Sequence, residues 1–180
     1  MEYSILGIDP GNNTGICVMT IGDDLKIKRI LTLTLNLSKS IETGETNYYL
    51  KRKLVLRDTL VKLSYDFNII AVGLENTFVN PKFPKSAITL MDYISCIELT
   101  FFDINSSIRF FKYPPKSVKM MIGAKGDATK EDMLHNLLTI KDLKNHLDTS
   151  SLTEHSVDAT SIAYITLQEI IRDPYLLYAI

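Results

Sequence analysis

Two acidic residues stand where short apolar runs end, at positions where a carboxylate could take part in chemistry. Asp9 follows the apolar run 4–8 within GIDPGNNTG, and the neighbouring glycines keep the space around its side chain open. Glu75 ends a second apolar run within GLENTF, where a buried charge is costly unless it is paired or used. Each position alone is equally compatible with a structural turn, or with an acid that emerges into solvent at a strand end.

A third acid belongs to EHSVDATSIAY, near the end of the sequence. His155 and Asp158 are three residues apart, so they share one face of a helix. Glu154 lies four residues before Asp158 and could serve in place of His155. A solvated helix start, where acids are favoured by the helix dipole, would give the same pattern. The small residues of the segment after Asp158 would let such a helix lie close against a sheet.

Taken together, these residues predict a site for divalent cations. Carboxylate oxygens favour Mg²⁺ or Mn²⁺ over zinc. Two such ions can activate water and stabilise the leaving oxygen in phosphodiester cleavage. We therefore expect two Mg²⁺ ions per site, with Mn²⁺ able to substitute, and a ligand set made of Asp9, Glu75, His155 and Asp158.

The elements that position these residues follow from hydrophobic periodicity. Three β-rich runs with short turns, at 4–8, 14–21 and 26–37, predict an antiparallel meander. Helical spacing covers 47–67 and 86–102, and the apolar runs 69–74 and 108–113 are typical of buried strands. A short helix opens at Pro114-Pro115 and ends near Gly123. Capping boxes at 129–132 and 151–154 precede a helix over 133–138 and a final helix to about Ile171.

The resulting order, β-β-β-α-β-α-β-α-α-α, predicts an α/β fold. We expect a mixed five-stranded sheet, three antiparallel strands followed by parallel strands, flanked by helices. The 180 residues fit a single domain over 1–180, and 46% apolar with 23% charged residues is a globular composition. Two cysteines without CxxC spacing predict reduced core thiols.

Net charge and targeting signals limit the expected cellular location and binding partners. No signal-peptide pattern or bilayer-length apolar run is present, so we expect a cytoplasmic protein without a membrane partner. The net charge of −1 and the pI of about 6.3 are not typical of a nucleic-acid binder. Binding to DNA would therefore require lysines that are spatially sorted from the acids.

Four segments resemble one family when they are read in order. GIDPGNNTG, GLENTF, PPKSVKMMIGAKGDATKEDM and EHSVDATSIAY, over about residues 5–165, look like the RuvC-type Holliday junction resolvases of the ribonuclease H-like superfamily. The resemblance implies a ribonuclease H-like fold and a Mg²⁺-dependent endodeoxyribonuclease. It also implies a homodimer that nicks two opposed strands of a four-way junction symmetrically. Asp9, Glu75 and Asp158 fall on the family's metal-binding acids, and His155 falls on a fourth position that is Asp or His.

The same resemblance implies a set of DNA contacts. Lys119 and Lys130 fall on lysines that support catalysis near the phosphate backbone. Phe78 falls on an aromatic residue that stacks on bases at the strand exchange, which is worth about 1–3 kcal/mol per base. A core position for Phe78 and plain surface positions for the lysines are the alternatives. The expected DNA-binding residues are Phe78, Lys82, Lys85, Lys119, Lys125 and Lys130.

Several functional alternatives stay open at this level. A nuclease of the same superfamily could act on other branched or flapped DNA, or on RNA–DNA hybrids. GIDPGNNTG also resembles the first phosphate loop of actin and the sugar kinases, but a second such loop is missing. A junction-binding protein without activity is disfavoured by the complete set of acids. The low pI and divergent loops favour a phage or mobile-element version, acting in the host cytoplasm without a branch-migration partner.

Two further apolar segments lie outside the four motifs. The helix expected over 86–102 is apolar on several sides and is the candidate dimer contact, although a buried core helix explains its pattern almost as well. The apolar tail 173–180 has no assigned role.

Overall fold

A five-stranded mixed sheet organises the protein, in the order β3-β2-β1-β4-β5. The computed structural model describes residues 1–39, 46–76 and 84–175. The strands are β1 (Glu2–Asp9), β2 (Asn13–Gly22), β3 (Ile27–Asn36), β4 (Ile69–Glu75) and β5 (Arg109–Tyr113). β1, β2 and β3 pair antiparallel, whereas β4 pairs parallel to both β1 and β5. This is the mixed topology that the sequence predicts.

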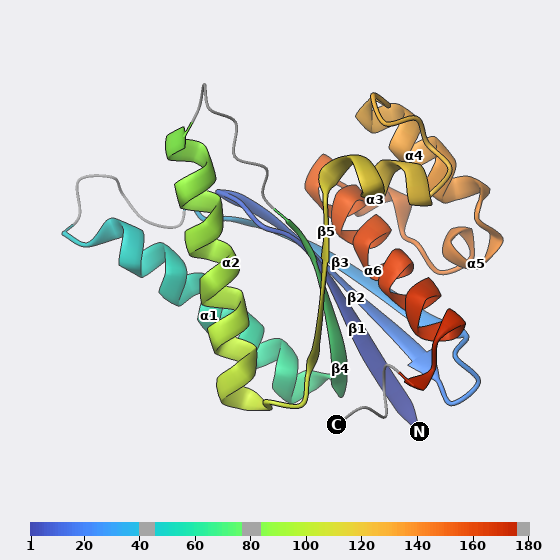
Figure 1. The fold of residues 1–180 in the computed structure, drawn as a ribbon, viewed down its shortest axis with the longest axis horizontal. Helices are drawn as coiled ribbons and strands as arrows, with labels where there is room; N and C mark the ends of the chain where they lie inside the picture. The colour runs from blue at the N-terminus through green and yellow to red at the C-terminus, as the bar shows by residue number, and fades with distance from the viewer. Residues whose placement is uncertain (40–45, 77–83, 176–180) are drawn as a thin grey trace.

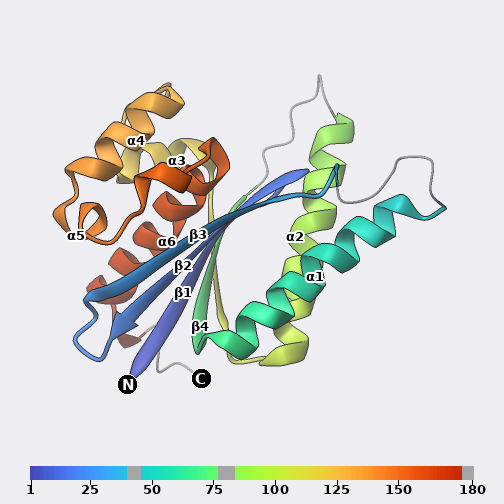
Figure 2. The same ribbon diagram turned by 180° about the vertical axis from the view of Figure 1, so that it is seen from behind.

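Helices cover both faces of the sheet (Figures 1 and 2). On one face lie α1 (Tyr48–Asp66) and α2 (Pro84–Ile104), which pack against each other. On the other face α6 (Glu154–Arg172) lies along β1, β2 and β4. Beside α6 are α3 (Pro115–Met121), α4 (Lys130–Thr139) and the single turn α5 (Lys141–Lys144), followed by a 3-10 turn, η1 (Thr149–Ser151). No helix among the described residues combines the length and apolarity needed to cross a membrane.

The sheet separates two apolar cores. Along β1, Ile5 contributes to the core under α6, whereas Leu6 and Ile8 contribute to the core under α1 and α2. This alternation follows from the period of two in a strand. All three side chains are fully buried, and each contributes about 1.5–3 kcal/mol by leaving water. The central strands are therefore held firmly from both sides, which fixes the positions at which they end.

Glycines let α6 approach the sheet closely. A Cβ at Gly7 would lie 2.1 Å from the carbonyl oxygen of Ala159, and one at Gly15 would lie 2.0 Å from that of His155. Both distances are far below van der Waals contact, so neither position accepts a side chain without a shift of the backbone. The N-terminal half of α6 consequently sits against the end of β1 and the start of β2.

The N-terminus of α6 differs from the sequence-based expectation. The expected capping box at 151–154 is wrong, because Glu154 is already the first helical residue. Thr153 is the N-cap, and its Oγ1 accepts the backbone N–H of Ser156, whose Oγ accepts that of Thr153. The capping box expected at α4 is present between Thr129 and Asp132. The turns α5 and η1 were not expected.

Candidate active site

Asp9 and Glu75 lie side by side at the ends of two parallel strands. Ile8 of β1 pairs with Leu74 of β4, so the residues that follow them emerge from the same edge of the sheet. The structure thus brings these two predicted site residues to one edge of the sheet. Carboxyl ends of parallel strands are where α/β folds place ligands.

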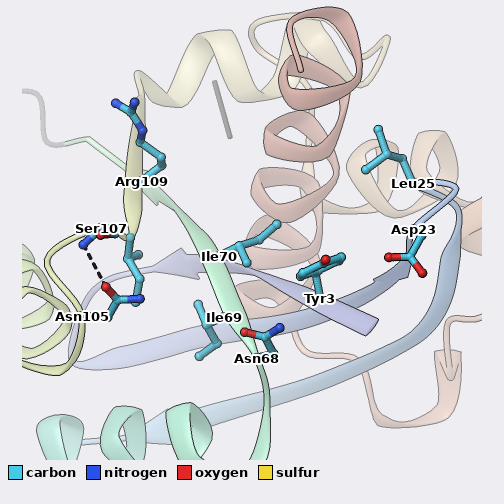
Figure 3. A pocket seen from close by; sticks show the side chains of 10 residues that line it. Tyr3, Asp23, Leu25, Asn68, Ile69, Ile70, Asn105, Ser107 and Arg109 are labelled. Carbon is cyan, nitrogen blue, oxygen red and sulfur yellow. Dashed lines mark hydrogen bonds between the residues drawn. The ribbon is translucent and has the colours of Figure 1, made fainter. Parts of the chain in front are cut away.

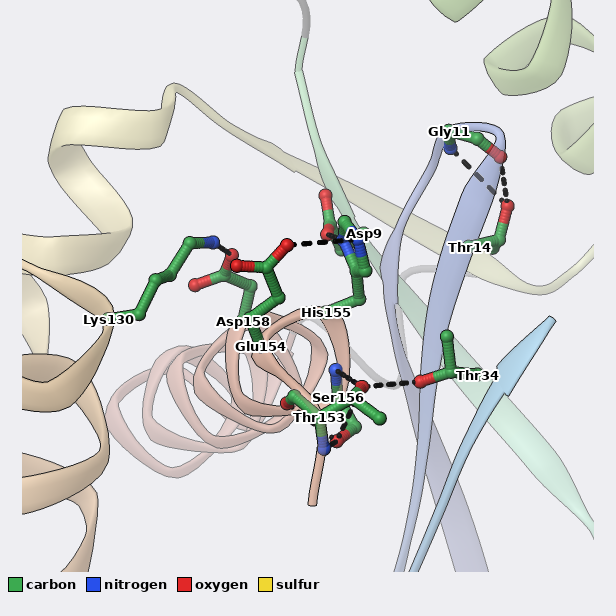
Figure 4. A network of polar contacts seen from close by, with 10 residues as sticks. All are labelled: Asp9, Gly11, Thr14, Thr34, Lys130, Thr153, Glu154, His155, Ser156 and Asp158. Carbon is green, nitrogen blue, oxygen red and sulfur yellow. Dashed lines mark hydrogen bonds and ion pairs between the residues drawn. The ribbon is translucent and has the colours of Figure 1, made fainter. Parts of the chain in front are cut away.

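The first turn of α6 brings His155 and Asp158 to this edge (Figure 4). The Nδ1 atom of His155 lies 2.9 Å from Oδ2 of Asp9. Its Nε2 lies 3.4 Å from a carboxylate oxygen of Glu154, whose side chain is 57% exposed. The Asp158 side chain is only 10% exposed. Of the two alternatives for the fourth position, His155 is thus the one that contacts Asp9.

Burial and mutual repulsion favour protonation of Glu75 and Asp9. Burial, together with the negative charges of Asp9 and Asp158, raises the pKa of Glu75 to about 7, against the opposing effect of Lys130 and Lys119. Burial also raises the pKa of Asp9, although the hydrogen bond from His155 lowers it. The carboxylates are thus crowded at a poorly hydrated place, where a bound cation would stabilise their ionised forms.

Two of the expected lysines reach the site from the α3–α4 segment. The Nζ atom of Lys130 forms an ion pair with the Asp158 carboxylate. The Nζ atom of Lys119 donates a 2.7 Å hydrogen bond to the carbonyl oxygen of Ala128, and its charge still lowers the pKa of Glu75. Lys125 is exposed on the loop between the two helices. The ammonium groups of Lys119 and Lys130 thus act on the acids, even though the net charge of the chain is −1.

The remaining expected contacts lie outside what the structure describes. Phe78 and Lys82 fall between residues 77 and 83, outside the described residues. Lys85 is in the first turn of α2, but its side chain is likewise outside the described part. Their placement on DNA stays a prediction.

The donor set suits a hard divalent cation. Three carboxylates and one imidazole supply mainly oxygen ligands, which magnesium and manganese prefer. Within the described residues, no three His, Cys, Asp or Glu side chains converge into a preformed metal site. Asp9 contacts His155 and Asp158 contacts Lys130, each through one of its two carboxylate oxygens.

Two positioning contacts could not be read from the sequence. Thr34 Oγ1 on β3 lies 2.6 Å from Thr153 Oγ1, which joins the start of α6 to the outer strand of the meander. Gly15 provides the close approach of the His155 backbone. A helix cap and a glycine in a strand are visible in the sequence, but the residue that each would meet is not.

A cavity of about 440 Å³ lies at the opposite end of the sheet (Figure 3). It is lined where β1, β4 and β5 begin, by residues that include Tyr3, Asn68 and Arg109. The acids Asp9 and Glu75 stand where β1 and β4 end. This cavity is therefore separate from the acidic cluster.

Comparison with known proteins identifies relatives over most of the chain. The model of the family described as crossover junction endodeoxyribonuclease RuvC matches residues 5–166. The crossover junction endodeoxyribonuclease RuvC of Chloroherpeton thalassium is 30% identical over 149 residues, which cover 81% of this chain and 75% of that relative.

Solved structures share the fold at lower identity. Thermus thermophilus RuvC is 21% identical, with a TM-score of 0.70 over 96% of this chain and 97% of its own. The same protein in complex with a Holliday junction substrate is 20% identical, with a TM-score of 0.71 over 94% of this chain and 95% of its own. The yeast mitochondrial Holliday junction resolvase is 17% identical, with a TM-score of 0.62 over 94% of this chain and 80% of its own. These similarities show that the chain shares the fold of these structures.

Proposed function

The chain belongs to the RuvC family of crossover junction endodeoxyribonucleases, and on that premise we propose that it resolves four-way DNA junctions by hydrolysing phosphodiester bonds. The observation that carries the proposal is the cluster of Asp9, Glu75 and Asp158 at one sheet edge. Burial and mutual repulsion there raise the pKa of Glu75 to about 7. A fold retains such a costly arrangement where a cation and a phosphate are to be bound.

The three acids and His155 would hold two Mg²⁺ ions, with Mn²⁺ able to substitute. When bound, these ions supply positive charge that acidifies water and offsets the charge of the phosphate. The oxygen-rich ligand set and the crowding of Glu75 by the charges of Asp9 and Asp158 support this assignment.

The protein's own side chains would orient the phosphate and handle protons. The His155 ring lies between Asp9 and Glu154, so it can exchange a proton at either nitrogen close to the reacting phosphate. The ammonium groups of Lys119 and Lys130 stand beside the acids, where they would bind phosphate oxygens and stabilise developing negative charge. Attack by water in line with the leaving oxygen would then yield 5′-phosphate and 3′-hydroxyl ends.

A broader set of side chains would bind the junction itself. Lys125, which is exposed on the loop between α3 and α4, is proposed to contact DNA. Phe78, Lys82 and Lys85 are proposed to contact it from the start of α2 and the segment before it. A cytoplasmic location is proposed with these contacts. The free thiols of Cys17 and Cys96 support it, because such thiols persist in reducing compartments.

We further propose that the enzyme acts as a homodimer through α2. Its outward face carries Ile88, Met91, Leu99 and Phe102, whose side chains are between 51% and 64% exposed. Their spacing places them on a single helical stripe. An apolar stripe of this kind on a soluble domain is typical of a protein interface. A second copy docked on it would supply two sites for two opposed strands.

The substitution Asp9→Asn tests the catalytic assignment. It keeps the size of the side chain and its ability to contact His155, but it removes a negative charge from the cation site. We expect loss of junction cleavage with retained junction binding, measured by denaturing gels and gel-shift assays. Wild-type cleavage by this variant would refute the role of Asp9. Parallel assays on Y-forks and RNA–DNA hybrids separate a junction resolvase from other nucleases of the superfamily.

A further inference from the structure

Lys130 points into the acidic cluster rather than away from it. It is the first residue of α4, and its Nζ atom forms an ion pair with Oδ2 of Asp158 (Figure 4). The Asp158 side chain is 10% exposed, whereas the Lys130 side chain is 47% exposed. The ammonium therefore reaches a nearly buried carboxylate from the solvent side.

This ion pair is a distinctive contact of the cluster. Over residues 1–39, 46–76 and 84–175, Lys130 is the only Lys or Arg that pairs with Asp9, Glu75 or Asp158. Asp9 is instead contacted by the imidazole of His155. Removing a partner from a poorly hydrated carboxylate leaves its charge uncompensated, which is costly. Lys130 thus supplies the positive charge that Asp158 requires before a divalent cation arrives.

We propose that Lys130 is a displaceable internal counter-ion, which a divalent cation must remove from Asp158 before the site is loaded. The inference rests on the proposed cation site. Once displaced, the ammonium becomes available for a phosphate oxygen of the substrate at the same place. Loading of the cation would thereby transfer Lys130 from a carboxylate of the protein to a phosphate of the DNA.

The local structure suits such a movement. The capping box of Thr129 and Asp132 fixes the backbone where α4 begins. The lysine side chain beyond it has a flexible four-carbon stem and a compact ammonium group. Because the backbone is fixed and the side chain is half exposed, the ammonium can leave Asp158 without any rearrangement of the helix.

Lys119 provides a matched control from the same basic segment. Its ammonium donates to the carbonyl oxygen of Ala128 and forms no ion pair with a carboxylate among the described residues. Its charge nevertheless acts on Glu75, as that of Lys130 does. Loss of Lys119 therefore removes one positive charge from the surroundings of the site without freeing a ligand. If variants of the two lysines differ in cation binding, the difference comes from the direct contact between Lys130 and Asp158. It does not come from the general electrostatic effect of a nearby positive charge.

The test measures Ca²⁺ binding by calorimetry to DNA-free wild type, Lys130→Met and Lys119→Met. We expect Lys130→Met to bind Ca²⁺ about tenfold more tightly than wild type, which corresponds to about 1.4 kcal/mol. Lys119→Met should differ from wild type by less than about threefold, because the Lys119 ammonium contacts the carbonyl oxygen of Ala128 and not a carboxylate of the cluster. Thermal unfolding gives a second readout. Lys130→Met should be less stable than wild type without Ca²⁺, and Ca²⁺ should raise its melting temperature by more than it raises that of wild type.

Lys130→Gln, which is uncharged but polar, repeats the measurement if the methionine variant folds poorly. Equal changes in the Lys130 and Lys119 variants would overturn the proposal, because the effect would then come from the field alone. Weaker Ca²⁺ binding by the Lys130 variants would also overturn it. If none of the proteins binds Ca²⁺, this inference and the proposed cation site fall together. Tighter binding by Lys130→Met, together with a wild-type protein that does not cut junctions, would support the inference and count against the proposed function.

Discussion

The substitution Glu75→Gln is expected to stabilise the metal-free protein at alkaline pH while it abolishes cleavage. Burial, together with the charges of Asp9 and Asp158, raises the pKa of Glu75 from 4.5 to about 7. Folding therefore favours the protonated carboxyl group, and the ionised form is held at a cost. Glutamine has nearly the same shape and carries no charge, so it removes that cost.

The magnitude follows from the size of the pKa shift. At about 1.4 kcal/mol per pKa unit, the change from 4.5 to about 7 corresponds to about 3 kcal/mol in the free energy of unfolding. Because the folded-state pKa is the higher one, this stability is present below about pH 4.5 and is lost as the pH rises through about 7. The variant should therefore exceed wild type by about 3 kcal/mol near pH 8, and by less than about 1 kcal/mol near pH 5.

Thermal or urea unfolding in EDTA at both pH values measures this difference. A gain of about 3 kcal/mol corresponds to roughly 6–12 °C in melting temperature for a chain of this size. Glu154→Gln is the matched control, because Glu154 is close to the site but its side chain is 57% exposed. It should leave stability nearly unchanged. The reasoning is refuted if Glu75→Gln is no more stable than wild type near pH 8, or if its advantage does not shrink at lower pH.

Three further predictions concern pH, packing and assembly. The rate of Mg²⁺-dependent cleavage should rise with pH through about 7, because Glu75 must be ionised to bind a cation, and a pH–rate profile that falls over this range would contradict its role. Gly15→Val should disturb the start of α6, because even a Cβ there would lie 2.0 Å from the His155 carbonyl oxygen. We expect this variant to lose at least about 2 kcal/mol of stability in unfolding assays and most of its cleavage in activity assays. Gly126→Val is the control and should be tolerated, because its Cβ would meet nothing within 4 Å. Phe102→Asp on the exposed stripe of α2 should give a monomer in light scattering, with its far-UV circular dichroism spectrum unchanged, and a variant that stays dimeric would place the interface elsewhere.

Local sequence signals were sufficient for the elements that carry the acids. β1 and β4 are short and apolar, and each ends on its acid, so periodicity alone places Asp9 and Glu75 where strands end. The parallel pairing of these strands then brings the two carboxylates together. The spacing of His155 and Asp158 likewise places both on one face of α6. These features depend on residues that are close in sequence or on regular pairing.

Other features depend on contacts between distant segments. The choice of His155 over Glu154 depends on how the start of α6 packs against the sheet, where Gly15 lets the backbone of His155 approach closely. Lys119 and Lys130 have different partners because of the way α3 and α4 pack. That packing determines which polar atoms each long side chain can reach. Periodicity and spacing carry no information about either, so the sequence could name these residues without placing their polar atoms.

The most direct test of the central claim uses an immobile four-way DNA junction, labelled on each strand in turn. The purified protein is incubated with it in Mg²⁺ and, in parallel, in EDTA. The account predicts paired, symmetric nicks on two opposed strands that disappear in EDTA and in the Asp9→Asn variant. An intact junction under all conditions, or nicks that persist in EDTA, would contradict it.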